Sequence, residues 1–198
     1  MNSQIIKDSR LAEEYLRVEH PSGLTMLLYP MKGFSTAYAM FSTKYGSIDT
    51  CFQRGEDADF VKVPEGIAHY LEHKMFESEE GDAFEKYAQT GASANAFTSF
   101  DKTCYLFACT DRFQESLEIL LDCVTHPYFT KETVEKEQGI IGQEIRMYED
   151  DPGWRVMFNL LQSLYQNNSV KVDIAGSIES IAQIDAELLY RCYHTFYN

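Results

Sequence analysis

The sequence has little of what marks a membrane-spanning, secreted or nucleic-acid-binding protein. No run approaches the roughly 18 consecutive apolar residues that a membrane helix needs, and the opening segment, MNSQIIKDSR, has no apolar signal region. Basic side chains are scarce as well: 17 Lys and Arg stand against 31 Asp and Glu, a net charge of −14. Binding to nucleic-acid phosphates requires a basic excess. We therefore expect a cytoplasmic protein without nucleic-acid or membrane partners.

Cysteine is uncommon and follows no pattern. No C-x-x-C pair suggests a zinc knuckle or a redox site among the five cysteines, which are Cys51, Cys104, Cys109, Cys123 and Cys192. On a strand, Cys104 and Cys109 would point to opposite faces because their separation is odd. We interpret all five as reduced thiols that act as small apolar fillers.

Apolar and aromatic side chains, in contrast, are plentiful. They include 13 Phe and 13 Tyr, and apolar residues make up 44% of the 198 positions. A chain of this length and composition can bury enough surface to offset the entropy lost on folding. We expect a single domain over residues 1–198. Because the last predicted helix runs to Asn198 without a terminal cap, we also expect this domain to belong to a longer chain.

Turn residues and hydrophobic periodicity place strands early in the chain and helices late. Strands are predicted over residues 24–29, 35–43, 46–52, 92–100 and 103–109. Helices are predicted over residues 66–76, 83–89, 111–124, 131–148, 154–165 and 178–197, with a weaker one at 10–16 and a polar loop at 53–62. This order predicts an α+β fold with a mixed, largely antiparallel sheet covered by helices.

The segment His69-Tyr70-Leu71-Glu72-His73 carries the clearest chemical signal. Two histidines four residues apart on a helix lie on one face and can reach the same ion. The carboxylate of Glu72 flanks that face, where it can act on a water molecule instead of binding the ion. The pattern H-x-x-E-H is the inverzincin motif. Isolated matches also arise by chance, but this one lies on a predicted helix with an apolar face.

A catalytic zinc site also needs a third protein ligand and an open fourth position. Spacing alone does not choose this ligand among His20, His126, His194 and the acidic residues. One predicted helix offers Glu137 and Glu144, which share a face because they are seven residues apart. They are roughly 10 Å apart along the helix axis. Only one of them could therefore bind the ion, and the other would support a ligand.

Three segments together resemble the pitrilysin/insulinase zinc peptidases, a family that includes the mitochondrial processing peptidase. They are Gly66–Phe76 (GIAHYLEHKMF), Gly91–Thr98 (GASANAFT) and Glu135–Ile145 (EKEQGIIGQEI). Their order and approximate spacing match the family over nearly the whole chain. The stretch Lys44–Asp49 is similar to that of bacterial cytosolic insulinase-like proteins. The resemblance implies a zinc-dependent metalloendopeptidase, with one zinc ion per chain and the N-terminal, processing-peptidase-like fold.

The resemblance implies a separate role for each residue of the metal site. His69, His73 and Glu144 would bind zinc, and Glu72 would be the general base. Glu137 would support a ligand without touching the ion.

The resemblance further implies a peptide substrate and a missing partner. Ala94, Asn95, Ala96 and Phe97 would lie on an edge strand that pairs with an extended peptide, which would grip the peptide by its backbone. Family members close two such domains around the substrate, and groups that clamp its carbonyl come from the other half. We therefore expect a missing C-terminal domain or a homologous partner subunit, and weak peptidase activity from residues 1–198 alone.

Two other functions stay open at this point. Family assemblies pair active with inactive subunits, so the chain could be a non-catalytic zinc-binding module, although the presence of Glu72 argues against this. Enzymes of the S-ribosylhomocysteine lyase type share H-x-x-E-H and take a cysteine as their third ligand. Cys123 and Cys192 are poorly spaced for that role.

Overall fold

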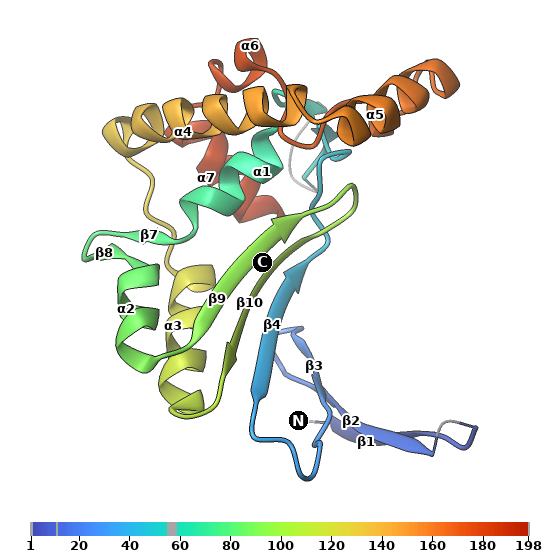
Figure 1. Cartoon of the computed structure of the whole chain (residues 1–198), viewed down its shortest axis with the longest axis vertical. Coiled ribbons are helices and arrows are strands. Elements are labelled where there is room, and N and C mark those ends of the chain that lie inside the picture. Colours follow the sequence, from blue (N-terminus) through green and yellow to red (C-terminus); the bar gives the residue numbers. More distant parts are fainter. Residues whose placement is uncertain (1, 11, 55–58, 198) are drawn as a thin grey trace. The chain divides into compact units, whose positions relative to one another are not determined.

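The computed structural model describes residues 2–10, 12–54 and 59–197, and the chain divides into two compact units at Ser35 (Figure 1). The first unit is an antiparallel sheet of three strands in the order β1-β2-β3. Its strands are β1 (Asn2–Asp8), β2 (Glu13–Glu19) and β3 (Thr25–Leu28). The helix predicted at 10–16 is wrong, because residues 13–16 pair with β1 instead. The single domain expected over residues 1–198 stays a prediction.

The second unit is built on an antiparallel sheet with β10 at its centre. The strands are β4 (Ala37–Thr43), β9 (Ser93–Thr98) and β10 (Thr103–Cys109), in the order β4-β10-β9. Alternate residues of β10 point into the core, where Thr103, Tyr105 and Phe107 are fully buried, as the two-residue period of a strand requires. The predicted α+β fold is confirmed, and every strand pairing among the described residues is antiparallel.

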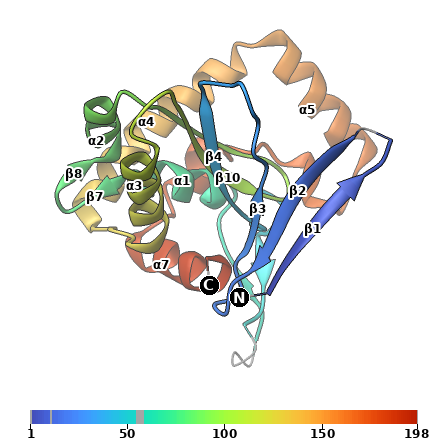
Figure 2. The same cartoon turned by 90° about the horizontal axis from the view of Figure 1, so that it is seen from below.

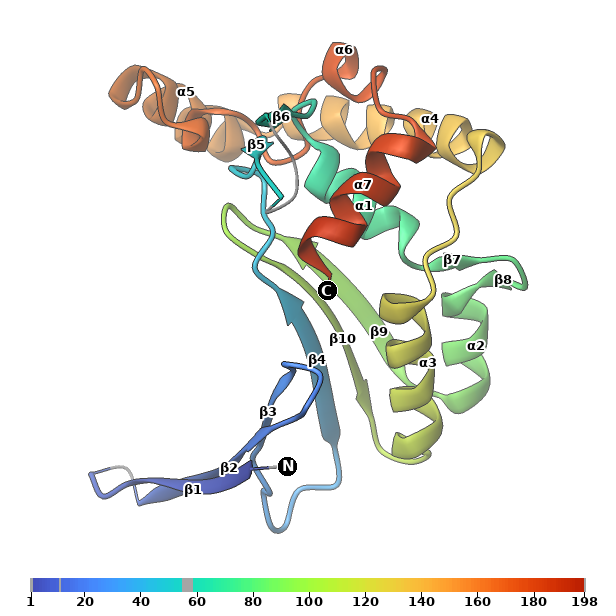
Figure 3. The ribbon, with the colours of Figure 1, turned by 180° about the vertical axis from the view of Figure 1, so that it is seen from behind.

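Four helices pack against the core of this sheet (Figure 2, Figure 3). They are α1 (Ile67–Lys74), α2 (Ala83–Thr90), α3 (Phe113–Thr125) and α7 (Ala186–Phe196). The ring of Phe107 on β10 packs against Tyr87 of α2 and Phe113 of α3. Tyr105 hydrogen-bonds through its hydroxyl to Tyr197, just after α7, at 2.7 Å. These contacts fix α2, α3 and the end of α7 against β10, and α1 contacts β9, β10 and α7.

Helix α4 (Lys131–Glu149) lies against α1 and away from the strands (Figure 1). A capping box at Thr130 starts it, and the Tyr70 hydroxyl of α1 donates a hydrogen bond to the carbonyl of Val134. The same face buries Ile141 and Ile145. The chain continues through α5 (Pro152–Leu164), the short turn η1 (Ser169–Lys171) and α6 (Ile178–Ile181).

Several boundaries differ from the prediction. Of the strand predicted at 46–52, only β5 (Cys51–Phe52) forms, because the amides of Ser47 and Ile48 donate to the loop between β9 and β10. The predicted loop 53–62 contains β6 (Val61–Lys62), while its residues 55–58 lie outside the described part.

Two further segments also depart from the prediction. Two short strands, β7 (Glu77–Ser78) and β8 (Gly81–Asp82), follow α1. The predicted final helix is two helices, because the Asp185 side chain accepts a hydrogen bond from the Leu188 amide and starts α7 anew.

In the part of the chain that the structure describes, no helix has the length and apolarity to cross a bilayer.

Candidate metal centre

Helix α1 presents the two histidines of the H-x-x-E-H motif on one face. Gly66 caps the N-terminal end of this helix, and its φ of 87° favours glycine. A Cβ atom there would lie 2.3 Å from the carbonyl oxygen of Ala175, so the close approach of two backbone segments also requires glycine. His69 and His73 follow one turn apart, with ring centroids 4.6 Å apart. His69 is only 7% exposed.

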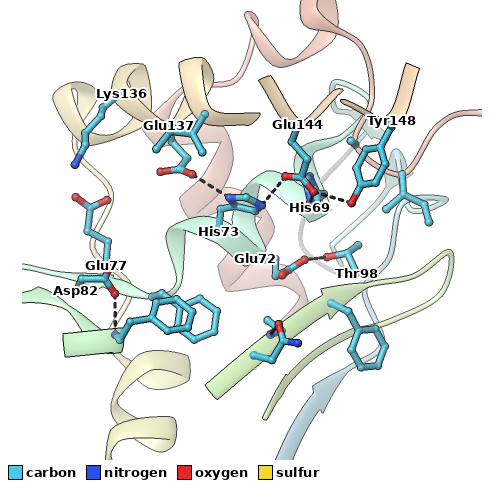
Figure 4. Close-up of a pocket in the computed structure, with 18 of the residues that line it drawn as sticks. His69, Glu72, His73, Glu77, Asp82, Thr98, Lys136, Glu137, Glu144 and Tyr148 are labelled. Atoms are coloured by element: carbon cyan, nitrogen blue, oxygen red, sulfur yellow. Dashed lines mark hydrogen bonds and ion pairs between the residues drawn. The ribbon is translucent and has the colours of Figure 1, made fainter. Parts of the chain in front are cut away.

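Glu144 of α4 faces both imidazoles (Figure 4). Its Oε1 lies 3.6 Å from Nε2 of His69, and its Oε2 lies 3.3 Å from Nε2 of His73. Ligand atoms in a tetrahedral zinc site, at about 2.0–2.1 Å from the ion, are roughly 3.3 Å apart. The two nitrogens and the carboxylate therefore fit zinc in both chemistry and spacing.

Among the described residues, His69, His73 and Glu144 are the one group of potential metal ligands whose donor atoms all lie within 4.8 Å of one another. The structure thus brings together the three residues that the sequence analysis assigned to zinc. His126 lies elsewhere, against Asp122. The group includes neither Cys123 nor Cys192, the thiols that a lyase-type site would need.

Glu137 contacts the opposite side of the His73 ring. Its Oε1 lies 2.9 Å from Nδ1 of His73, while the other ring nitrogen faces Glu144. A carboxylate on the outer nitrogen fixes the tautomer and the orientation of a metal-binding imidazole. This is the placement that the expected supporting role of Glu137 requires, and the role itself stays a prediction.

The charges of this group are strongly coupled. Hydrogen bonds from His69 and His73 hold the pKa of Glu144 well below its usual range, despite partial burial. Burial would lower the pKa of His73, but hydrogen bonds to Glu137 and Glu144 outweigh it and raise the pKa to about 10. The site therefore favours positive charge between its carboxylates, and a bound cation would replace a proton there.

Glu72 lies beside the group without belonging to it. It is 8% exposed, and its Oε2 accepts a hydrogen bond of 2.7 Å from the hydroxyl of Thr98 on β9. Burial raises the pKa of Glu72, an effect that His69 and the Thr98 hydrogen bond partly offset. A carboxylate with a raised pKa beside a metal site is suited to accept and return a proton.

A pocket of about 680 Å³ opens over these residues and runs along β9. Of the residues predicted to contact a peptide, Asn95, Ala96 and Phe97 line the pocket. Ala94 is not among the residues that line it and, like Ala96, packs against the core. In the described part of the chain, β9 pairs only with β10 and forms an edge of the sheet. Pairing with a peptide stays a prediction.

The sequence analysis missed two aromatic residues of this site. The hydroxyl of Tyr148 donates a hydrogen bond of 2.7 Å to Oε1 of Glu144, and Trp154, which stacks on Tyr148, also lines the pocket. Tyr148 follows Glu144 by four residues on the same helix, the spacing at which side chains meet. That spacing was the available signal for Tyr148. Nothing in the sequence indicated the contact with Trp154, which lies in the first turn of another helix, α5.

Comparison with known proteins identifies relatives of this chain. The chain is 50% identical over 193 residues to a Bacillus subtilis (strain 168) protein named "Uncharacterized zinc protease YmfH", a match that covers 98% of this chain and 45% of the relative. The chain therefore spans less than half the length of that relative.

Solved structures have the same fold. A crystal structure described as that of a "putative M16-like peptidase from Alicyclobacillus acidocaldarius" matches with a TM-score of 0.88 at 44% identity, over 92% of this chain and 43% of that one. Pitrilysin matches with a TM-score of 0.79 at 19% identity, over 99% of this chain and 22% of its own. The model of the family described as insulinase (peptidase family M16) matches residues 55–177, more than half of the chain. The chain therefore belongs to the insulinase family of peptidases.

Proposed function

We propose that this chain is the metal-binding half of a zinc-dependent metalloendopeptidase that hydrolyses extended peptides. The observation that carries the proposal is the convergence of the His69, His73 and Glu144 donor atoms within 4.8 Å, with the buried carboxylate of Glu72 beside them. Membership of a peptidase family and a relative with a zinc-protease name support it.

The residues of the site divide the chemistry among them. His69, His73 and Glu144 would hold zinc, which supplies Lewis-acid polarisation of the scissile carbonyl and lowers the pKa of a water molecule to about 7. Glu72 accepts the proton of the attacking water and passes it to the leaving amine. Thr98 keeps the Glu72 carboxylate in place through its hydroxyl. Glu137 orients the imidazole of His73 from the outer side.

The edge strand β9 is the proposed substrate-binding element. Its residues Asn95, Ala96 and Phe97 line the pocket that contains Glu72. Strand addition at a sheet edge binds a peptide by its backbone and leaves the side chains to pockets. We therefore propose that the substrate lies extended along β9 with its scissile bond near Glu72.

The proposed enzyme includes a second half that this chain does not contain. The chain covers 45% of its 50% identical relative. Removal of one group that stabilises the transition-state charge can lower a rate by roughly 100 to 1,000-fold, and we propose that such groups come from a C-terminal domain or a homologous partner subunit.

Peptide cleavage with and without that half tests the proposal. We expect residues 1–198 with zinc to cut extended peptides slowly or not at all, and addition of the C-terminal half of the same protein to restore cleavage. Glu72→Gln in the assembled protein should abolish turnover. If the assembled wild-type protein binds zinc but does not cleave peptides, the proposed peptidase activity is wrong and a non-catalytic zinc-binding module is favoured. Full rates from residues 1–198 alone would contradict the need for a partner.

A further inference from the structure

Tyr148 contacts a proposed zinc ligand but takes no part in the mechanism described above. It lies on α4 one turn after Glu144, and its hydroxyl donates a hydrogen bond of 2.7 Å to Oε1 of that carboxylate. In Figure 4 the phenol approaches Glu144 from the side opposite His73. Glu144 therefore has a partner for each of its two oxygens before any metal is bound.

The phenol of Tyr148 is itself held in place. Its ring stacks on the indole of Trp154, with ring centroids 4.5 Å apart and an angle of 16° between the planes. Nε1 of Trp154 donates to Oδ2 of Asp173 at 2.5 Å, and Oδ1 of Asp173 accepts from the amide of Ala175 at 3.0 Å. A stacked and hydrogen-bonded neighbour restricts the rotation of the phenol, so the hydroxyl stays directed at Glu144.

The two oxygens of Glu144 have different surroundings. Oε2 lies 3.3 Å from Nε2 of His73. Oε1 lies 3.6 Å from Nε2 of His69 and also accepts the Tyr148 hydrogen bond. A hydroxyl bound to Oε1 competes with a metal ion for that oxygen, so the ion is directed to Oε2 beside His73. A glutamate side chain has several rotatable bonds, and holding it in one orientation reduces the entropy that is lost when it binds an ion.

We propose that Tyr148 is a positioning residue for Glu144, which it holds so that the carboxylate binds the metal through Oε2 alone. This inference rests on the proposed function, because it assumes that the ion binds at Glu144. Glu137 positions His73 in the same site, so each of these two ligands has a partner that does not bind the ion. Four-coordinate geometry with one position left for water requires such one-oxygen binding by the carboxylate.

The variant Tyr148→Phe separates this role from simple packing, because it removes the hydroxyl and keeps the ring that stacks on Trp154. The matched control is Tyr165→Phe at the C-terminal end of α5, where the side chain is 42% exposed. Zinc affinity is measured on the chain of residues 1–198 by competition with a chromogenic chelator. Partners of metal ligands typically change affinity by about 10 to 100-fold. We expect a loss in that range for Tyr148→Phe and none for Tyr165→Phe.

The visible absorption of Co²⁺ in the same variants gives a second measurement that a purely structural role would not change. Co²⁺ with four ligands absorbs more strongly than Co²⁺ with five or six. Release of Oε1 in Tyr148→Phe should let both oxygens of Glu144 bind and weaken these bands. A second variant, Trp154→Phe, keeps an aromatic ring against Tyr148 but loses the hydrogen bond to Asp173, and its zinc affinity should fall less than that of Tyr148→Phe.

The outcomes separate the two proposals. If the wild-type chain binds no zinc, the proposed function fails and this inference fails with it. If the wild-type chain binds zinc and Tyr148→Phe matches it in affinity and in Co²⁺ spectrum, the proposed function stands and the positioning role of Tyr148 is wrong.

Discussion

The Glu137 carboxylate lies 2.9 Å from Nδ1 of His73, on the side of the imidazole that faces away from Glu144. The two glutamates are seven residues apart on α4 and contact opposite nitrogens of one ring. A single helix face therefore supplies both a candidate ligand and a carboxylate that is placed to orient another candidate ligand. This relationship gives the two carboxylates different expected effects on zinc binding.

Replacement of Glu137 should weaken zinc binding without abolishing it. Glu137→Gln removes the negative charge beside His73 but leaves the three proposed ligands in place, so we expect about 10 to 100-fold lower affinity. Glu144→Gln should lower the zinc affinity far more, because it removes a proposed ligand. Competition titration against a chelator measures both variants. Equal, complete loss of zinc in Glu137→Gln and Glu144→Gln would show that Glu137 is not a supporting residue.

The hydroxyl of Thr98 should affect turnover but not metal binding. It donates to Oε2 of Glu72, the proposed base, and a hydrogen bond to a charged group contributes about 1.5–3 kcal/mol. Thr98→Val in the assembled protein should lower kcat by roughly 10 to 100-fold at unchanged zinc content. Thr98→Ser keeps the hydroxyl and should keep most of the activity. If kcat is unchanged in Thr98→Val, the hydroxyl of Thr98 does not contribute to catalysis.

The α1 and α4 helices, and the histidines and glutamates on them, could be predicted from the sequence. Hydrophobic periodicity and the motif spacing are local properties, and α1 (Ile67–Lys74) and α4 (Lys131–Glu149) lie within a few residues of their predicted bounds. The choice of Glu144 as the third ligand could not be made from spacing alone. It depends on packing between α1 and α4, which are far apart in the sequence.

The mistaken boundaries also depend on tertiary pairing. Residues 13–16 could form a helix in isolation, but pairing with β1 makes them part of a strand. The backbone at Gly46 approaches Phe100 so closely that a Cβ would lie 2.3 Å from its carbonyl oxygen, and the amides of Ser47 and Ile48 hydrogen-bond to this loop in place of a strand partner. In both places pairing with another segment of the chain overrides the local preference.

Gly66 should be far less tolerant of alanine than Gly91. Both have positive φ, 87° and 74°, which costs an alanine about 1–2 kcal/mol. A Cβ at Gly66 would also meet the Ala175 carbonyl oxygen at 2.3 Å, whereas one at Gly91 would meet nothing within 4 Å. Urea unfolding should therefore show a larger loss of stability, and zinc titration a larger loss of affinity, for Gly66→Ala. Equal losses of stability would contradict the close approach between α1 and Ala175.

The Cys123 and Cys192 thiols should react slowly at neutral pH. Burial raises the pKa of each thiol to about 11, whereas an ordinary thiol has a pKa of about 8.5. At pH 8 their thiolate fraction, and with it the alkylation rate, should be roughly 200-fold lower than for an ordinary thiol, and the rate should rise as the pH approaches 11. Mass spectrometry of the chain after timed alkylation measures this. Modification of Cys123 at pH 8 as fast as that of the exposed Cys51 would contradict the burial.

Zinc content of three forms of the chain tests the central claim most directly. The wild-type chain, His69→Ala and Glu72→Gln are purified free of metal, reloaded with zinc, desalted and analysed for bound metal by mass spectrometry. We predict one zinc ion per chain in the wild type, a loss of zinc in His69→Ala, and full retention in Glu72→Gln, because Glu72 lies beside the ligands without being one. A wild-type chain without zinc, or a Glu72→Gln variant that loses zinc as readily as His69→Ala, would contradict this assignment of ligands and base.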